Sequence, residues 1–342
     1  MRILFLIGNG FDLNVGLNTS FNDFLDYYLE ESIPENVDPV GQRYIIRLKE
    51  DIKNNIDLWS NFEMEYGKHM SKLGKMGSHV HSLQEELDII NDDIRDKLST
   101  YIAKEDEHSY FAESALNVFL TDIIKPEKYL RDFEISDINN RRLNYWTNSS
   151  NVVDFITFNY TNTIEHLLNE KKILFSGFEV HEPIHIHGYY NERMILGVND
   201  ASQINNEDLS KLVYANDTLV KSECNHTYGD SHTNKAKNLI KDAQLICCYG
   251  LSFGDTDKLW WIKVCESLKN KTDLIVILFF YSSSFFDYSN SGPKLQNEMR
   301  KIKDIFLSKS EIEEPMRSNL ARRIYVSINA PIFNFKIDNK NH

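Results

Sequence analysis

The sequence predicts an α/β protein in which a Rossmann-like parallel sheet carries helices on both faces and a large helical insertion. Three observations support this prediction. Five consecutive apolar residues, 3–7, run directly into a Gly-Asn-Gly turn, as a strand buried on both faces runs into a nucleotide-binding loop. Residues 42–134 show helical periodicity with almost no strand signals. Apolar, strand-like runs alternate with helices again from residue 151 onward.

This pattern predicts two domains. Residues 1–30 and 150–335 would form a discontinuous nucleotide-binding domain, and residues 40–135 a helical insertion or cap. The 342 residues, of which 42% are apolar, are enough for both cores.

The net charge of −13 limits the class of partner. Gripping a nucleic-acid backbone requires clustered Lys and Arg, so the composition disfavours nucleic acid as a partner. Backbone amides can still hold a small anion. The four cysteines form no C-x-x-C pair, and we expect buried thiols rather than bridges or zinc ligands. They are Cys224, Cys247, Cys248 and Cys265.

No apolar run approaches the roughly 18 residues that a membrane-spanning helix requires. The first apolar run is too short for a signal-peptide core and is followed at once by glycines. We therefore expect a soluble, cytoplasmic protein that makes no membrane contact.

The first half of the chain is predicted as one strand followed by helices. After the strand at residues 3–7, a loop leads to a helix over 21–29, with Ser20 as its N-cap. Amphipathic helices follow at residues 44–56, 83–98 and 111–124. Residues 59–63 stand out because they hold two aromatic residues and an acid, and simple packing by Trp59 and Phe62 is the favoured interpretation.

In the second half of the chain, predicted strands alternate with predicted helices. Strands are predicted over residues 152–158, 183–188, 193–198, 244–249 and 274–280, with an edge strand over 324–328. Helices are predicted over residues 163–169, 205–223 and 259–268, and residues 336–342 would form a polar tail.

Four of the predicted strands end in polar turns, at residues 8–10, 158–161, 185–188 and 250–255. The carboxyl ends of parallel strands share one edge of a sheet, and ligands bind there, so we expect these turns to converge. Each turn also has a purely structural alternative. Residues 8–10 would be a tight turn, Asn159 a helix N-cap, His187 a satisfied buried histidine, and residues 254–255 a loop and cap.

The common phosphate and nucleophile motifs are absent. The chain has no G-x-x-x-x-G-K-[ST] and no G-x-S-x-G, and Leu13 stands where G-x-G-x-x-G requires its third glycine. These absences disfavour P-loop nucleotidases, α/β-hydrolases and hydride-transferring dehydrogenases.

Histidines and an acid cluster at residues 181–187. His185 and His187 alternate on a predicted strand and project to one face, as paired metal ligands do. No second motif supplies the carboxylates of a hydrolytic metal site, so we expect no metal. In the alternative, one histidine is a general base and the other is structural.

Taken in order, these motifs resemble the AbiH family of bacteriophage abortive-infection proteins, within the sirtuin-like NAD-binding superfamily. The similar stretches are Ile-Gly-Asn-Gly-Phe-Asp-Leu from residue 7, Phe-Asn-Tyr-Thr from 158, His-Ile-His-Gly from 185 and Gly-Leu-Ser from 250. Asp12 replaces the serine of the sirtuin motif G-A-G-x-S, and Thr161 replaces the aspartate of T-Q-N-x-D. The zinc cysteines of sirtuin deacetylases are missing, so the resemblance disfavours protein deacylation.

The resemblance implies NAD as ligand and substrate, bound in a sirtuin-type site. Asn159 would orient the ribose or a water, and His187 would act as general base. A carboxylate such as Asp12, Asp255 or Asp257 would stabilise a ribosyl cation, and Asp12 is our choice. The residues implied in cofactor binding are Gly8, Asn9, Gly10, Phe11, Thr19, Thr161, Gly250, Leu251, Ser252 and Asp255.

We therefore expect an antiphage effector that hydrolyses NAD to nicotinamide and ADP-ribose. A phage component as its trigger and a homo-oligomeric assembly are compatible with that function. Two alternatives stay open. One is a non-catalytic, nucleotide-binding protein that senses phage, and the other is a metal-dependent nuclease or phosphoesterase.

Overall fold

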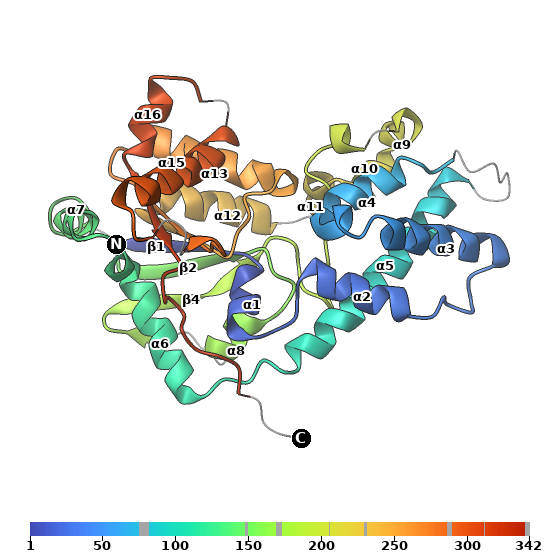
Figure 1. The fold of residues 1–342 in the computed structure, drawn as a ribbon, viewed down its shortest axis with the longest axis horizontal. Coiled ribbons are helices and arrows are strands. Elements are labelled where there is room, and N and C mark those ends of the chain that lie inside the picture. The colour runs from blue at the N-terminus through green and yellow to red at the C-terminus, as the bar shows by residue number, and fades with distance from the viewer. Residues whose placement is uncertain are drawn as a thin grey trace. The chain divides into compact units, whose positions relative to one another are not determined.

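A seven-stranded, mostly parallel β-sheet organises the fold in the computed structural model (Figure 1). The structure describes residues 1–74, 82–147, 150–168, 173–204, 206–228, 231–285, 289–310 and 312–338. The strand order is β3-β4-β2-β1-β5-β6-β7, and only the β3–β4 pair is antiparallel. The strands are β1 (Arg2–Ile7), β2 (Val152–Thr157), β3 (Ile173–Phe175), β4 (Phe178–His185), β5 (Leu245–Tyr249), β6 (Ile275–Phe280) and β7 (Ile324–Ile328).

Strand β1 lies inside the sheet because it pairs with β2 on one side and with β5 on the other. Its residues alternate between the two faces. Ile3, Phe5 and Ile7 belong to one hydrophobic core, and Leu4 and Leu6 belong to a second core on the opposite face. The burial of this apolar run on both faces is confirmed.

Helices cover both faces of the sheet, as predicted (Figure 1). One core contains residues from α6 (Glu113–Ile124), α7 (Asp132–Asn144) and α8 (Thr163–Leu168). The other core contains residues from α12 (Ser231–Asp242), α13 (Lys258–Asn270), α15 (Gly292–Ser308) and α16 (Met316–Ala321). The mixed α/β class with a mostly parallel sheet therefore follows the sequence prediction.

Contacts divide the chain into two compact units. The sheet unit consists of residues 1–17, 108–186 and 232–342, and the helical unit of residues 18–107 and 187–231. This division differs from the domain bounds expected from the sequence. Helix α6 packs on the sheet because Phe119 and Ile123 enter its core, whereas residues 187–231, expected beside the sheet, belong to the helical unit.

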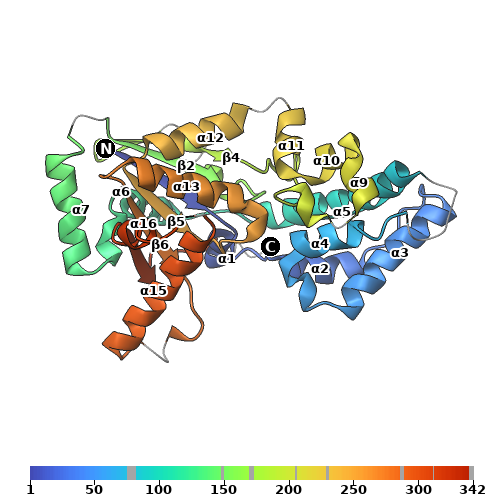
Figure 2. The ribbon, with the colours of Figure 1, turned by 90° about the horizontal axis from the view of Figure 1, so that it is seen from above.

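The helical unit contains α2 (Phe21–Glu30), α3 (Pro39–Asn54), α4 (Phe62–Met70), α5 (Leu83–Asp106), α9 (Glu207–Lys211), α10 (Val213–Leu219) and α11 (Lys221–Thr227) (Figure 2). Trp59 and Phe62 are buried, and the Phe62 ring stacks on Phe21 and Tyr66. This confirms the packing interpretation of the aromatic residues there. A buried ion pair joins α4 to α11, with 2.8 Å between Lys221 Nζ and Glu63 Oε2.

Three predictions of local structure are wrong. A short helix, α1 (Gly10–Val15), begins directly after β1 where a loop was expected, and Gly16 ends it with a φ of 109°. Residues 193–198 form no strand, and within them Val198 alone makes a bridge, to Val220. A Cβ on Gly197 would lie 2.1 Å from the Leu219 carbonyl oxygen, so this segment packs against α10 instead of extending the sheet.

The third error concerns residues 205–223, where α9, α10 and α11 replace one long helix. Residues 169 and 205, at the bounds of two predicted helices, lie outside the described residues. Four 3-10 helices complete the described structure. They are η1 (Leu58–Asn61), η2 (Pro126–Tyr129), η3 (Ala201–Gln203) and η4 (Asp255–Asp257).

The C-terminal segment crosses α1 and is therefore not simply a polar tail. Asn14 Nδ2 donates to the Phe333 carbonyl oxygen over 2.8 Å, and the Ile337 amide donates to the Val15 carbonyl oxygen over 2.9 Å. The Phe333 ring packs against Phe11 with 5.3 Å between centroids. Residues 339–342 of the predicted tail lie outside the described residues.

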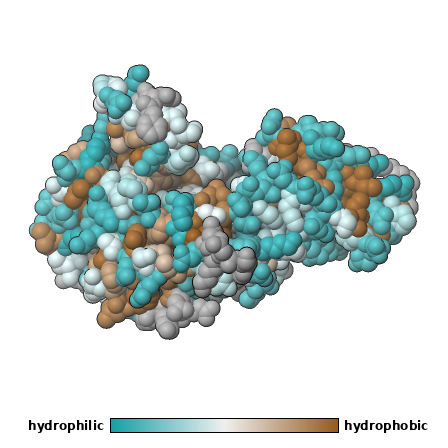
Figure 3. Space-filling view, turned by 60° about the horizontal axis from the view of Figure 1, so that its bottom comes forward, coloured by the Kyte–Doolittle hydropathy of each residue, from teal (hydrophilic) through white to brown (hydrophobic). Residues whose placement is uncertain are grey.

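In the described part of the chain, no helix has both the length and the apolar character needed to cross a membrane. All four cysteines are buried and free, as expected. On the face shown in Figure 3, hydrophilic side chains dominate and apolar ones occur in separate patches.

Candidate functional site

Three of the four predicted turns meet at the carboxyl edge of the sheet unit. The Gly8 amide donates to the Tyr249 carbonyl oxygen at the end of β5 over 2.9 Å, and the Gly10 amide donates to the Gly250 carbonyl oxygen over 3.0 Å. Asn159 Nδ2, after β2, donates to the Gly8 carbonyl oxygen over 3.3 Å. The predicted convergence is therefore observed for the turns after β1, β2 and β5. His185, the first residue of the fourth predicted turn, also reaches this edge, where its Nδ1 lies 3.1 Å from the Asn159 carbonyl oxygen.

Close backbone packing explains the glycines of the β1 and β5 turns. A Cβ on Gly8 would lie 2.5 Å from the Gly250 carbonyl oxygen, and one on Gly10 would lie 2.5 Å from Gly250 Cα. Gly250 has a φ of 69°, and its own Cβ would lie 2.7 Å from the Phe11 nitrogen. Larger residues at these positions would force the two turns apart.

The same packing gives the turn after β1 a structural role, where a nucleotide-binding loop was expected. The amides of Gly8, Gly10 and Phe11 all donate to backbone carbonyl oxygens within the protein, so they do not form an open phosphate cradle. The Phe11 side chain is fully buried among Phe119, Tyr249 and the C-terminal phenylalanines. The structure places Phe11 in the core rather than in a pocket wall, because α1 turns its ring inward.

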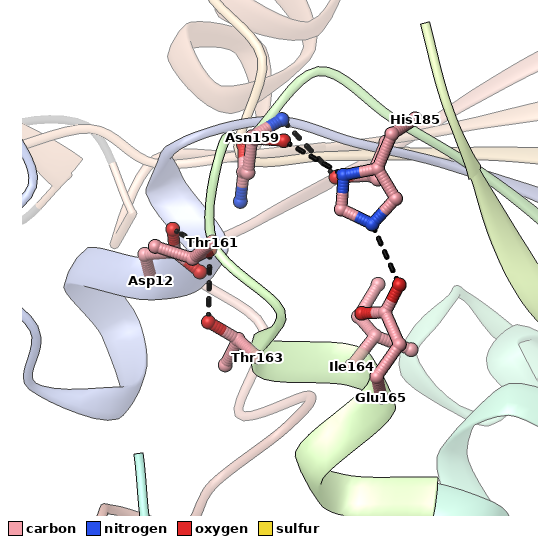
Figure 4. Close-up of a pocket in the computed structure, with 8 residues that line it drawn as sticks. Asp12, Asn159, Thr161, Thr163, Ile164, Glu165 and His185 are labelled. Atoms are coloured by element: carbon pink, nitrogen blue, oxygen red, sulfur yellow. Dashed lines mark hydrogen bonds and ion pairs between the residues drawn. The ribbon is translucent and has the colours of Figure 1, made fainter. Parts of the chain in front are cut away.

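A small polar pocket lies at this edge, lined by Asp12, Thr157, Asn159, Thr161, Thr163, Ile164, Glu165 and His185 (Figure 4). Its empty volume is about 150 Å³. This volume includes open solvent, and the side chains around the pocket pack so closely that no enclosed space for a ligand remains between them.

One wall of the pocket is a hydrogen-bonded chain that ends on Asp12. Thr163 Oγ1 donates to Thr161 Oγ1 over 3.0 Å, and Thr161 Oγ1 donates to Asp12 Oδ2 over 2.7 Å (Figure 4). Asp12 comes from α1 and is buried, whereas Thr163 begins α8 and Thr161 lies in the loop just before it. The Thr161 hydroxyl thus helps to hold the Asp12 carboxylate at the pocket.

The other wall contains His185, the last residue of β4. Its Nε2 lies 2.6 Å from Glu165 Oε1, and its Nδ1 lies 3.1 Å from the Asn159 carbonyl oxygen (Figure 4). Asn159 stands between the two walls. Its backbone N–H donates to Thr157 Oγ1 over 3.1 Å, and this bond helps to fix the position of Asn159.

Hydrogen-bond acceptors dominate the pocket. Among the described residues, Asn159 Oδ1 and Glu165 Oε2 are buried and have no hydrogen-bond partner. The residues that line the pocket include no Lys or Arg. Buried polar atoms are usually paired, so unpaired acceptors of this kind favour a ligand that brings hydroxyl or other N–H and O–H donors.

The remaining predicted site residues lie outside this pocket. Asn9 precedes α1, and Leu251 contacts Gly8, while Ser252 is exposed. Asp255 forms an exposed ion pair with Lys309, at 2.7 Å between Lys309 Nζ and Asp255 Oδ1.

His187 and Thr19 belong to the helical unit by their contacts. Both are buried, and the Ile195 amide donates to the His187 carbonyl oxygen over 2.8 Å. Gly188 has a φ of 71°, and a Cβ there would lie 2.0 Å from the Arg193 carbonyl oxygen. The glycine of the His-Gly pair is thus required by this turn itself.

The sequence did not point to Glu165, Thr157, Thr163 or Ile164. It offered His185 as a metal ligand, a general base or a structural residue. The register of β2 and β4 pairs Thr157 with His185. Alternation along the predicted strand at residues 152–158 could have pointed to Thr157. No sequence signal placed Glu165, because its position depends on where α8 starts.

The buried thiols of β5 are not candidates for nucleophiles. Burial raises the pKa of Cys247 well above its usual range and also that of Cys248. Burial likewise raises the pKa of Tyr249 at the end of the strand. Among the described residues, no group of three or more His, Cys, Asp or Glu side chains is arranged to hold a metal ion.

The family model described as "Bacteriophage abortive infection AbiH" matches residues 4–279 of the chain. The match includes β1 to β6 and every residue that lines the pocket. None of the curated proteins compared with the chain matches it significantly.

Proposed function

We propose that this chain, which belongs to the AbiH family of bacteriophage abortive-infection proteins, acts by hydrolysing NAD to nicotinamide and ADP-ribose. The carboxyl edge of the sheet would be the nucleotide site, of the sirtuin-like type that its motifs resemble. Depletion of this cofactor would stop the metabolism that an infecting phage needs.

The order of the parallel strands supports a nucleotide site at this edge. With the antiparallel β3 set aside, the order β4-β2-β1-β5-β6-β7 is that of the doubly wound dinucleotide-binding fold. In such sheets the chain reverses its direction of growth beside the first strand, and ligands bind at the carboxyl ends there. Asp12 and Asn159 follow the two strands at this point.

The acceptor-lined pocket is the observation that carries the proposal. When the nicotinamide–ribose bond breaks, its electron pair goes to the nicotinamide nitrogen and C1′ of the ribose becomes cationic. Carboxylate and amide oxygens stabilise such a cation and accept hydrogen bonds from ribose hydroxyls. Asp12, Asn159 and Glu165 supply these oxygens in one pocket.

Water then attacks C1′ and releases a proton. The resemblance assigns the acceptance of this proton to His187. Thr161 would hold Asp12 in place through its hydroxyl group. Gly8, Gly10 and Gly250 would shape the edge by their close packing. NAD would lie over this edge with its ribose facing the pocket.

Release of nicotinamide from NAD by the purified full-length chain tests this proposal. The assay is run with and without extract of phage-infected cells, in case a phage component is the trigger. We expect release by the unmodified protein, and none by Asn159→Ala or His187→Ala. Asn140→Ala, at an exposed position of α7, is the control and should keep full turnover. Unchanged turnover in both site variants would exclude the mechanism.

A second candidate is a nucleotide-binding protein that senses phage without turnover. The pocket volume of about 150 Å³ and the internal hydrogen bonds of the Gly8 and Gly10 amides favour it. Calorimetry distinguishes the two candidates. Tight binding of NAD without release of nicotinamide, together with toxicity in cells that His187→Ala does not change, supports the second.

A further inference from the structure

We propose that Glu165 and His185 form a positioning pair that holds the loop at residues 158–162, and with it the Asn159 amide, in working geometry. This inference rests on the proposed function, and it adds two residues to which neither the motifs nor the family match assigns a role. It concerns contacts within the sheet unit alone.

The pair joins three elements at the carboxyl edge. His185 ends β4, opposite Thr157 at the end of β2, and Glu165 lies in the first turn of α8. The imidazole therefore bridges the start of α8 and the loop that leads into it, through its contacts with Glu165 Oε1 at 2.6 Å and the Asn159 carbonyl oxygen at 3.1 Å. His185 is only 2% exposed, so water does not compete freely for these bonds.

Both ring nitrogens of His185 face acceptors. The Asn159 carbonyl oxygen can only accept, so Nδ1 carries a proton and donates. Nε2 lies 2.6 Å from Glu165 Oε1, which is a hydrogen-bond distance. The two contacts together fix the orientation of the ring.

The orientation of the His185 ring affects the pocket because the ring contacts Asn159. The imidazole holds the Asn159 backbone, while the Asn159 side chain donates to the Gly8 carbonyl oxygen over 3.3 Å. Asn159 Oδ1, which has no partner among the described residues, is thereby presented to the pocket. Loss of the ring contact would let the loop move, and a displacement of about 1 Å can lower turnover roughly 100-fold.

The same strand provides a matched control pair. His181 of β4 is also hydrogen-bonded to a carboxylate, with 2.7 Å between its Nδ1 and Asp154 Oδ1. Its partners, Asp154 and Glu179, belong to β2 and β4 rather than to a loop, and none of the three lines the pocket. Loss of this pair should affect stability without moving Asn159.

The test compares His185→Gln, Glu165→Gln and His181→Gln in the full-length chain, with NAD as the probe. We expect kcat to fall roughly 10- to 100-fold in the two pocket variants while KM changes little, because the loop that they free orients the reacting group. Imidazole added to His185→Gly should restore turnover, and 1-methylimidazole, which lacks one N–H donor, should not. His181→Gln should keep the kcat of the unmodified protein.

Proton NMR of histidine-labelled protein tests the pair independently of activity. We expect a strongly downfield imidazole proton that disappears in both His185→Gln and Glu165→Gln and persists in His181→Gln. If the unmodified protein releases no nicotinamide, the proposed function fails and this spectrum decides the pairing alone. If the protein turns over NAD but kcat is unchanged in both pocket variants, the positioning role is wrong and the proposed function stands.

Discussion

The buried carboxylates toward the two ends of the parallel sheet have different partners. Toward the amino end, each oxygen of Asp154 on β2 has a side-chain partner: Arg2 Nε lies 3.5 Å from Oδ2, and His181 Nδ1 lies 2.7 Å from Oδ1. At the carboxyl end, Asp12 is held by the Thr161 hydroxyl, and the pocket around it has no Lys or Arg in its lining.

From this difference we infer that Asp154 has a structural role and Asp12 a functional one. A buried charge normally requires a partner, since removing it from water is unfavourable. Asp154 follows this rule and needs no further explanation. The acceptor-rich carboxyl end is tolerable if a ligand supplies the missing donors and positive charge, which is what a ribosyl group does during cleavage of NAD.

The largest expected effect comes from removing the charge at the carboxyl end. Asp12→Asn keeps the shape and the Thr161 contact but loses the negative charge that would stabilise the ribosyl cation. We expect nicotinamide release to fall roughly 100-fold or more. The melting temperature should change little, because asparagine has the same shape and can still accept the hydrogen bond from Thr161. Full turnover by this variant would contradict the contrast between the two ends.

The next largest effect tests the glycines that shape the same end. Gly250→Ala would place a Cβ 2.7 Å from the Phe11 nitrogen at a φ of 69°, and we expect the free energy of unfolding to fall by roughly 2–4 kcal/mol. Gly292→Ala is the control, since nothing lies within 4 Å of its Cβ. Denaturant unfolding measures both, and equal stability of the two variants would show that the turns do not need close packing.

Removing the charge at the amino end should give the opposite result to Asp12→Asn. Asp154→Asn removes the carboxylate that Arg2 and His181 share, although Arg2 keeps Asp242 and His181 keeps Glu179 as partners. We expect the free energy of unfolding to fall by roughly 1–3 kcal/mol. Nicotinamide release by the folded variant should equal that of the unmodified protein. A loss of turnover comparable to that of Asp12→Asn would mean that the two ends do not differ in role.

The smallest expected effect comes from removing one hydroxyl group from the hydrogen-bonded chain that ends on Asp12. Thr161→Val keeps the volume but removes the hydroxyl that donates to Asp12 and accepts from Thr163. We expect a loss of stability of about 1 kcal/mol and a moderate fall in turnover. Thr161→Ser, which restores the hydroxyl, should recover most of the turnover, and no difference between the two variants would exclude the hydrogen bond as the cause.

The sequence predicts the frame of the sheet well. Its central strands β1, β2, β5 and β6 are apolar runs, and the first three are followed within two residues by glycine or asparagine, so the sequence predicts all four with small errors at their ends. The same turns gave Asp12, Asn159 and Thr161, which the structure brings together at one pocket.

The rest depends on packing that local patterns do not encode. β3 has only three residues, which are too few for a strand pattern to show. Glu165 and His185 meet because α8 starts where it does beside β4, and the C-terminal segment packs on α1 through single hydrogen bonds and aromatic contacts. Contacts of this kind join residues far apart in the sequence, without a period or a motif.

A nucleotide profile of phage-infected cells that express the chain tests the central claim most directly. Cells with the unmodified protein are compared with cells that express Asn159→Ala at equal levels, before and after infection. We expect NAD to fall after infection, with nicotinamide and ADP-ribose rising together, only in cells with the unmodified protein. If the unmodified protein still stops the phage while NAD stays constant, the acceptor-lined pocket is not an NAD-cleaving site.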